Sequence, residues 1–394
     1  MRGAPGAGFF SPDSVYSAQR EEVQRRDRRN GKFRQNRPVT RSIAAEAPLA
    51  DAAVPARPAA SRAVAIWLLL CALAVALMVV VGGVTRLTHS GLSIVEWQPL
   101  VGAVPPLSAA DWQTLFEKYR QTPEYRLVNR GMSLAEFKAI FWWEYLHRLL
   151  GRIIGIVFLV PLLWFWLRGR IDARLGWKLA GVFVLGGLQG AMGWYMVASG
   201  LVDEPRVSHL RLTAHLGLAF LVLGAMLWIA LDLLHPQRAG KDRGLARFAG
   251  VVAALVFLQV LLGGLVAGIR AGKAYNTFPL MNGHLVPPET FALEPWWLNF
   301  FNDMATVQLD HRLIAWLLLL LVPWLWWRVR QPGAPARARL TAHLLLGTLA
   351  AQFALGVWTL LEAVPVALGA AHQGVATLVF AAALATAHAL RTSR

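Results

Sequence analysis

Four of the ten histidines lie near the beginning of long apolar stretches: His147, His215, His311 and His372. An imidazole in such a stretch either hydrogen-bonds within a packed interior or serves as a metal ligand. Two imidazoles that face each other across a flat ring suit axial ligation of a heme iron. Zinc or copper fits less well, because carboxylates and thiols are not present beside the histidines in both halves of the chain.

The two halves of the chain differ chemically at the residue three positions before the first histidine of each half. Glu144 precedes His147, whereas Gln308 precedes His311. A spacing of three places both side chains on one helix face. A carboxylate in an apolar setting is costly unless it is protonated or paired, so Glu144 is a candidate acid, base or charge-stabilising group. The alternative is structural: Glu144 pairs with Arg148 or supports an imidazole N–H.

An internal repeat relates these residues. The matched pairs of segments are Val81-Gly82-Gly83-Val84 with Leu262-Gly263-Gly264-Leu265, Glu144 to Arg148 with Gln308 to Arg312, Gln189 and Gly193 with Gln352 and Gly356, and His215 with His372. Four histidines at equivalent positions of a duplicated frame favour ligation over packing. The other six, His89, His209, His235, His284, His343 and His388, have no counterpart, and we expect them to be solvated or capping groups.

Apolar stretches long enough to cross a bilayer, which needs about 20 residues, position these side chains. The sequence predicts an all-α integral membrane protein of eight transmembrane helices, arranged as two tandem, pseudo-symmetric four-helix bundles over residues 63–233 and 248–391. A polar tail, residues 1–62, precedes them and is expected to be disordered. In an up-and-down bundle the second and fourth helices are diagonal, so each half can aim two imidazoles at one ligand.

The distribution of basic residues indicates how the chain is oriented in the membrane. The 394 residues are 56% hydrophobic and 15% charged, yet the net charge is +17. This composition excludes a disordered chain. The excess positive charge is explained by membrane topology and by contact with the anionic lipids of the bilayer, so a nucleic-acid partner is not required. Of the 39 basic residues, 26 fall in the tail and in alternate loops, so both termini are predicted to be cytoplasmic. The histidines then lie toward the periplasmic face of a bacterial inner membrane, which is favoured over a mitochondrial one.

The loop over residues 84–139 is too long for a simple connector. Ser108 with Asp111, and Ser133 with Glu136, are spaced as capping boxes that begin helices. One apolar helical face is predicted from five residues, namely Leu107, Trp112, Leu115, Phe116 and Tyr119. This pattern predicts an amphipathic helix lying over the first-half site. A substrate gate and a structural cap are both compatible with it.

The chain resembles the heme A synthase family of bacterial and mitochondrial inner membranes. The motifs that carry the resemblance are Thr85-Arg86-Leu87, Ser90-Gly91-Leu92-Ser93, Glu144-Tyr145-Leu146-His147-Arg148, Asn276-Thr277-Phe278-Pro279-Leu280-Met281 and Gln308-Leu309-Asp310-His311-Arg312, with His215 and His372. They cover almost everything after the tail. Some members carry cysteine pairs in the outer loops; this chain has only Cys71 and resembles the cysteine-free branch.

The resemblance implies oxidation of the C8 methyl of heme O, through an alcohol, to the formyl group of heme A for cytochrome c oxidase. It implies that His311 and His372 hold a resident heme B, that His147 and His215 hold the substrate heme, and that Glu144 is the catalytic carboxylate. On this interpretation Arg148, Arg152 and Arg312 neutralise heme propionates. Candidate partners are heme O synthase, cytochrome c oxidase assembly factors, an electron donor that the sequence does not identify, and a second copy of the chain.

A different class also uses paired intramembrane histidines. A diheme b-type electron-transfer cytochrome or quinol oxidoreductase often places its hemes near opposite membrane faces, whereas the four histidines here are expected near one face. A heme transporter on the same repeat would not need a carboxylate in one half only.

Overall fold

The computed structural model describes residues 59–98, 101–202, 205–236 and 240–391. Most of the predicted tail, residues 1–62, lies outside them. The described residues form helices and no β-strand, and eight of these helices are long and apolar enough to cross a membrane. They are α2 (Ala59–Leu87), α5 (Leu134–Leu167), α6 (Ala173–Ala198), α7 (His209–Leu234), α8 (Arg243–Ile269), α11 (Met304–Arg330), α12 (Ala336–Leu361) and α13 (Val366–Ala389). The predicted all-α membrane fold is confirmed.

Several helices begin earlier than their apolar stretches. The α5 helix starts at Leu134 because Ser133 and Glu136 form a capping box, in which each side chain binds the backbone of the other. Likewise, α6 follows the N-cap Asp172, whose carboxylate accepts from Leu175 N. Capping side chains therefore set where these helices begin, while hydropathy marks only the part that crosses the bilayer.

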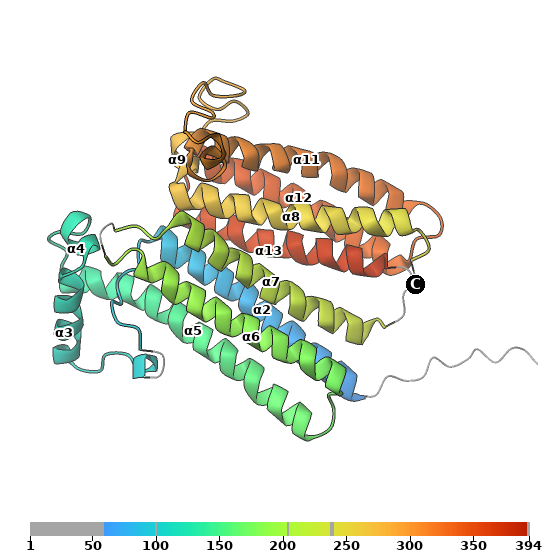
Figure 1. The fold of residues 1–394 in the computed structure, drawn as a ribbon, viewed down its shortest axis with the longest axis horizontal. Helices are drawn as coiled ribbons and strands as arrows, with labels where there is room; N and C mark the ends of the chain where they lie inside the picture. The colour runs from blue at the N-terminus through green and yellow to red at the C-terminus, as the bar shows by residue number, and fades with distance from the viewer. Residues whose placement is uncertain (1–58, 99–100, 203–204, 237–239, 392–394) are drawn as a thin grey trace, which may run out of the picture. The chain divides into compact units, whose positions relative to one another are not determined.

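Helix contacts follow the repeat (Figure 1). In the first half, α2 and α6 each pack against both α5 and α7; in the second half, α8 and α12 each pack against both α11 and α13. The histidine-bearing helices α5 and α7 therefore face each other diagonally, and so do α11 and α13. This arrangement is consistent with two tandem four-helix bundles.

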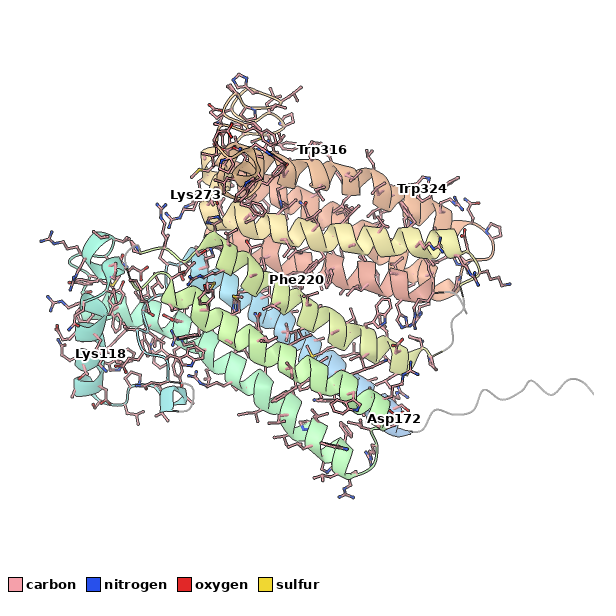
Figure 2. The ribbon with its side chains drawn as sticks, in the orientation of Figure 1. Lys118, Asp172, Phe220, Lys273, Trp316 and Trp324 are labelled. Carbon is pink, nitrogen blue, oxygen red and sulfur yellow. The ribbon has the colours of Figure 1, made fainter. Side chains whose placement is uncertain are left out.

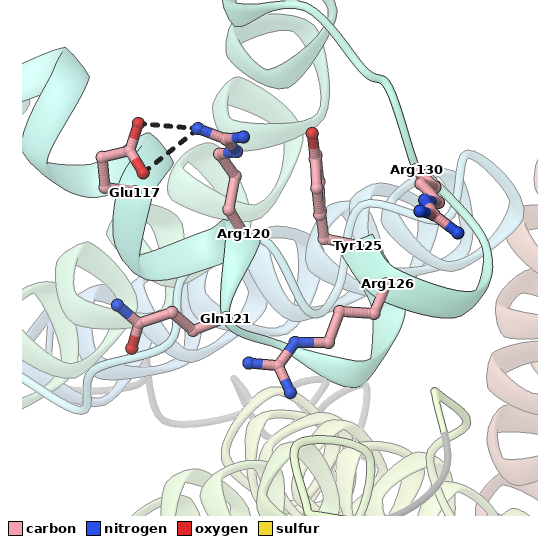
Figure 3. A pocket seen from close by; sticks show the side chains of 6 residues that line it. All are labelled: Glu117, Arg120, Gln121, Tyr125, Arg126 and Arg130. Atoms are coloured by element: carbon pink, nitrogen blue, oxygen red, sulfur yellow. Dashed lines mark hydrogen bonds and ion pairs between the residues drawn. The ribbon is translucent and has the colours of Figure 1, made fainter.

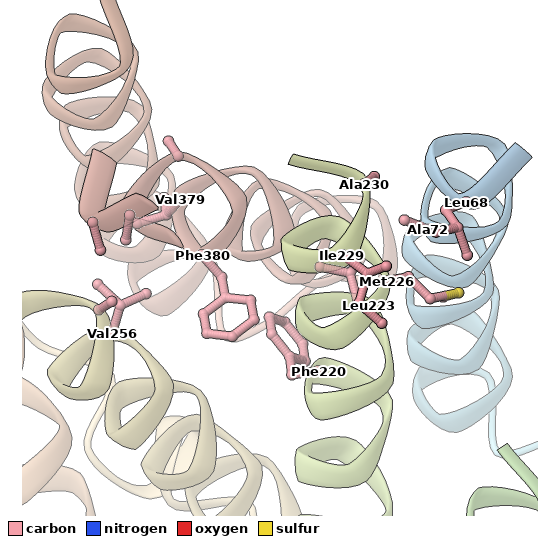
Figure 4. Packing of buried hydrophobic residues seen from close by; sticks show 14 of the residues in the cluster. Leu68, Ala72, Phe220, Leu223, Met226, Ile229, Ala230, Val256, Val379 and Phe380 are labelled. Atoms are coloured by element: carbon pink, nitrogen blue, oxygen red, sulfur yellow. The ribbon is translucent and has the colours of Figure 1, made fainter. Parts of the chain in front are cut away.

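The two sets of helices meet through α2 and α7 on one side and α8 and α13 on the other. Phe220 of α7 and Phe380 of α13 form an edge-to-face pair at this junction, with ring centroids 5.4 Å apart (Figure 4). By contrast, Trp316 and Trp324 project from α11 and remain exposed in the isolated chain (Figure 2). Exposed apolar side chains of this kind are expected where helices face lipid.

Residues 101–133, which we call the cap, lie over one end of the first half (Figure 1). The cap contains α3 (Ala109–Arg120) and α4 (Pro123–Leu127). The predicted capping box of Ser108 and Asp111 is present, and Trp112, Phe116 and Tyr119 are buried against α5. The prediction was wrong for Leu107, which precedes the helix and is 81% exposed. Because Leu107 lies before the first turn of α3, its side chain does not align with the apolar face of that helix.

Candidate functional site

The four histidines lie on the diagonal helices as predicted. His147 on α5 pairs with His215 on α7, and His311 on α11 pairs with His372 on α13. Within each pair the imidazoles are near enough to interact electrostatically. Each ring is only half-buried, although it lies among the helices. The histidines therefore remain partly accessible between the helices.

A glycine on a neighbouring helix faces each imidazole. A Cβ added to Gly82 of α2 would lie 3.0 Å from Nε2 of His147, and one added to Gly263 of α8 would lie 3.3 Å from Cε1 of His311. The same relation holds for the second histidine of each half, where Gly193 of α6 faces His215 and Gly356 of α12 faces His372, both with Cε1 at 2.8 Å from an added Cβ. The sequence shows these glycines as repeat markers, but not that they contact the rings. A larger residue at any of the four positions would crowd the imidazole.

Glutamines complete the polar surroundings of the rings. Nε2 of Gln259 lies 3.2 Å from Nε2 of His311, and Nε2 of Gln352 lies 3.4 Å from Nε2 of His372. Several buried polar atoms have no hydrogen-bond partner among the described residues: Nδ1 of His215, His311 and His372, and Oε1 of Gln189, Gln259 and Gln352. A buried unsatisfied polar atom costs about 1–3 kcal/mol. Two imidazoles on diagonal helices, with unpartnered ring nitrogens, are a donor set that fits a heme iron.

Glu144 is 2% exposed and has four hydrogen-bond donors. Ser93 Oγ and Ile94 N donate to its Oε2 at 2.7 and 2.8 Å, while Arg148 Nε and Nη2 donate to its Oε1 at 3.0 and 2.6 Å. Both oxygens of the carboxylate are thus engaged, one by the loop and the other by Arg148. The Arg148 ion pair that the structural alternative requires is therefore present, and it leaves a charge-stabilising role for Glu144 open.

The second half has the same geometry without the carboxylate. Gln308 is buried, and its Oε1 has no partner among the described residues. Arg312 donates instead to four backbone carbonyls of the preceding loop, those of Tyr275, Thr277, Pro279 and Leu280. No acidic side chain pairs with Arg312 within the described part of the chain, so its buried positive charge lacks a nearby negative partner.

The arginines that follow His147 and His311 on α5 and α11 bind the backbone of nearby loops. Arg148 donates to the carbonyls of Ile94 and Glu96, and Arg152 donates to that of Gln98. Arg312 does the same for the loop that follows α8, as described above. Binding of heme propionates by Arg148 and Arg312 thus stays a prediction, and much of their donor capacity already serves the loops.

His388 differs from the expectation that it is solvated or a cap. It is 1% exposed, and its Nε2 lies 3.2 Å from Oδ1 of Asp232. Arg337 and Arg391 contact its two ring nitrogens. The expectation failed because the ends of α7, α12 and α13 converge in space, which the sequence spacing did not reveal. This cluster is distant along each helix from the paired histidines.

Eight membrane helices with two diagonal histidine pairs define a multi-pass membrane protein with two paired-histidine sites. A family model described as cytochrome oxidase assembly protein matches residues 65–384. The chain belongs to this family, which includes the heme A synthases, and is a membrane oxidoreductase.

Several relatives are similar over nearly their whole length. A heme A synthase of Nitrosospira multiformis is 61% identical over 337 residues, which cover 84% of this chain and 95% of the relative. One of Nitrosomonas eutropha is 56% identical, with coverages of 82% and 92%. One of Parvibaculum lavamentivorans is 52% identical, with coverages of 84% and 94%. The resemblance derived from the motifs is confirmed, and heme is the implied cofactor class.

Proposed function

We propose that this enzyme is a heme A synthase that oxidises the C8 methyl of heme O, through an alcohol, to the formyl group of heme A. The observation that carries the proposal is the duplicated pair of diagonal histidines, each facing a glycine, with a carboxylate in only one half. The relatives named heme A synthase support the same activity.

The asymmetry suggests which half holds which heme. His311 and His372 would hold a resident heme B, because Gln308 offers no group for proton transfer or charge stabilisation. His147 and His215 would hold heme O, since Glu144 lies three residues before His147 on the same helix. A bound heme supplies redox-active iron at each site. In each half, two histidines on diagonal helices would hold that iron.

Glu144 would act through its charge. Four hydrogen bonds, two of them from Arg148, occupy both of its carboxylate oxygens. It is better suited to stabilise positive charge that develops beside the methyl group than to remove a proton. Arg148 would position Glu144, because its guanidinium donates both to the carboxylate and to the carbonyl of Ile94 in the loop.

The membrane arrangement follows the distribution of basic residues. We place the protein in a bacterial inner membrane with both termini cytoplasmic, so that the paired histidines lie toward the periplasmic face. Residues 63–233 would form the substrate half and residues 248–391 the resident-heme half. Heme O synthase, assembly factors of cytochrome c oxidase and an electron donor are the proposed partners.

The test is heme extraction from membranes of a strain that lacks the gene. Complementation with the wild-type gene should replace heme O by heme A. Complementation with Glu144→Gln should retain bound heme in the purified protein but accumulate heme O or the alcohol, whereas His372→Ala should lose the resident heme. Unchanged heme profiles on complementation would overturn the proposed activity and favour a diheme electron-transfer cytochrome. Normal heme A yield from Glu144→Gln would leave Glu144 a structural residue.

A further inference from the structure

Basic side chains from both halves of the chain gather where the ends of α2 and α8 meet. We call these four residues the junction cluster: Arg86, His89, Arg270 and Lys273. Hydrogen bonds to the backbone connect them. Arg86 donates through Nη2 to the carbonyl of Ala267, to which the Arg270 N–H also donates. The N–H of His89 donates to the Arg86 carbonyl at 3.2 Å, and that of Lys273 donates to the Arg270 carbonyl at 3.0 Å.

Acidic side chains do not neutralise this cluster within the described part of the chain. None of the ion pairs there includes Arg86, Arg270 or Lys273. Arg270 and Lys273 are exposed, and Nε of Arg86 is buried without a hydrogen-bond partner. A group of cations with no acid among them attracts an anion, and a buried N–H without an acceptor is costly until an acceptor binds.

The pKa of His89, in the loop after α2, reflects the same excess of positive charge. Partial burial lowers this pKa, and the charges of the other three members of the cluster lower it further. The His89 imidazole therefore adds a neutral hydrogen-bonding group to the three cations.

Arg270 occupies a position that favours glycine. It is the C-cap of α8 and has a left-handed backbone with φ of 61°. Glycine is the usual residue in this conformation because it has no Cβ. The turn ends α8 and begins α9 (Ala271–Ala274), which carries Lys273 (Figure 2). A long cationic side chain at this position thus has a reason other than the geometry of the turn.

The junction cluster lies beside both histidine sites. Arg86 follows Gly82, the glycine that faces His147, by four residues, and Arg270 follows Gly263 by seven. These spacings correspond to about 6 and 10 Å along the helix axes. Residues four and seven apart share a helix face. The cations therefore lie near the ends of the two helix faces whose glycines meet the imidazoles.

We propose that the junction cluster binds the propionate carboxylates of the hemes held by the paired histidines, an assignment that rests on the proposed function. Heme carries two propionates on one edge of its ring. Guanidinium and ammonium groups bind carboxylates through charge-assisted hydrogen bonds. The guanidiniums of Arg148 and Arg312 already donate to loop carbonyls. Arg270 and Lys273, by contrast, present exposed charges that no described acid neutralises.

Heme uptake by the heme-free full-length protein in detergent tests this assignment without turnover. Heme B and its dimethyl ester offer the histidines the same iron, but the ester has no carboxylates. Wild type should bind heme B at least about tenfold more tightly than the ester. Sodium chloride should weaken the binding of heme B more than that of the ester. In the double variant Arg270→Gln/Lys273→Gln the preference for heme B should fall below about threefold.

A matched control removes two exposed cations from the cap. Arg126 and Arg130 line a surface pocket of about 520 Å³ (Figure 3), and the double variant Arg126→Gln/Arg130→Gln should keep the preference of wild type. Equal binding of heme B and the ester by wild type would overturn the proposal, and so would an unchanged preference in Arg270→Gln/Lys273→Gln. If phospholipid copurifies with wild type and is lost from that variant while the preference is unchanged, the cluster binds a lipid headgroup instead.

Failure of the proposed function would give a different result. A wild-type protein that prefers heme B to the ester but does not convert heme O would refute the proposed activity. The same result would support the junction cluster as a site for heme carboxylates, because the uptake measurement does not depend on conversion.

Discussion

Glu144 and Gln308 occupy equivalent positions in the two halves, but their surroundings differ in charge. Glu144 neutralises Arg148, whose side chain is also largely buried. Gln308 cannot neutralise Arg312, which binds only backbone carbonyls. The first half therefore contains a buried ion pair and the second a buried cation. A buried cation favours the reduced, less positive state of a nearby redox group, so Arg312 would raise the reduction potential of the heme proposed for that half.

The Glu144–Arg148 pair predicts strong coupling. Removing one partner of a buried ion pair costs about 3–5 kcal/mol because the other charge is left without compensation. Glu144→Gln and Arg148→Gln should each destabilise the protein, while the double variant should be less destabilised than their sum by at least about 2 kcal/mol. Denaturant unfolding in detergent measures the cycle. Additive effects, within about 0.5 kcal/mol, would show that the pair contributes no specific stability.

At the scale of helices, the contact between a glycine and an imidazole recurs four times. In each case the glycine lies on a helix adjacent to the one that carries the histidine. Without a side chain at the glycine, the two helices can approach closely at each ring. Other glycines of the same helices have open space instead: Gly190 on α6 and Gly347 on α12 meet no atom within 4 Å of an added Cβ.

This difference provides matched controls. Gly193→Ala would bring a methyl to 2.8 Å from Cε1 of His215, so the ring must move and heme binding should fall at least tenfold. Gly356→Ala should have the same effect at His372. Gly190→Ala and Gly347→Ala, one on each of the same two helices, should bind heme as wild type does. Heme content per purified protein measures the outcome, and equal loss from all four variants would show a general helix-packing effect.

At the scale of the whole molecule, the paired glycines at the ends of α2 and α8 serve two purposes. Gly82 faces His147, while Gly83 contacts Gln373 of α13 in the other half. Gly263 faces His311, and Gly264 contacts Thr213 of α7. Gln373 Nε2 also donates to the carbonyl of Val79 at 3.0 Å. The same short motif therefore allows close approach of a histidine ring within one half and close packing between the two halves.

Orientation in the membrane is also a property of the whole molecule. Cys71 is buried and should not react with a membrane-impermeant thiol reagent, so the wild-type protein is the control. In intact cells with a permeable outer membrane, Thr114→Cys in the exposed part of the cap should be labelled, whereas Lys241→Cys should be labelled only after lysis. Labelling of Lys241→Cys alone before lysis would invert the proposed topology.

The sequence by itself determined the membrane helices, the repeat and the four histidines. Apolar length and spacing decide these properties locally: a stretch that must cross hydrocarbon has to be helical, and duplicated motifs mark equivalent positions. The capping boxes at Ser108 and Ser133 were predictable for the same reason, because their bonds join residues three apart.

Only the tertiary structure decided which residues meet across helices. Glycines on α2, α6, α8 and α12 contact rings on other helices, and Ser93 and Ile94 bind Glu144 from about 50 positions away. Glu124 lies in the long first loop by sequence, yet the fold of the cap buries it to 4% exposure. Burial and long-range contacts depend on how helices pack against one another. Sequence periodicity reports only which residues share a face of one helix, so it cannot show these contacts.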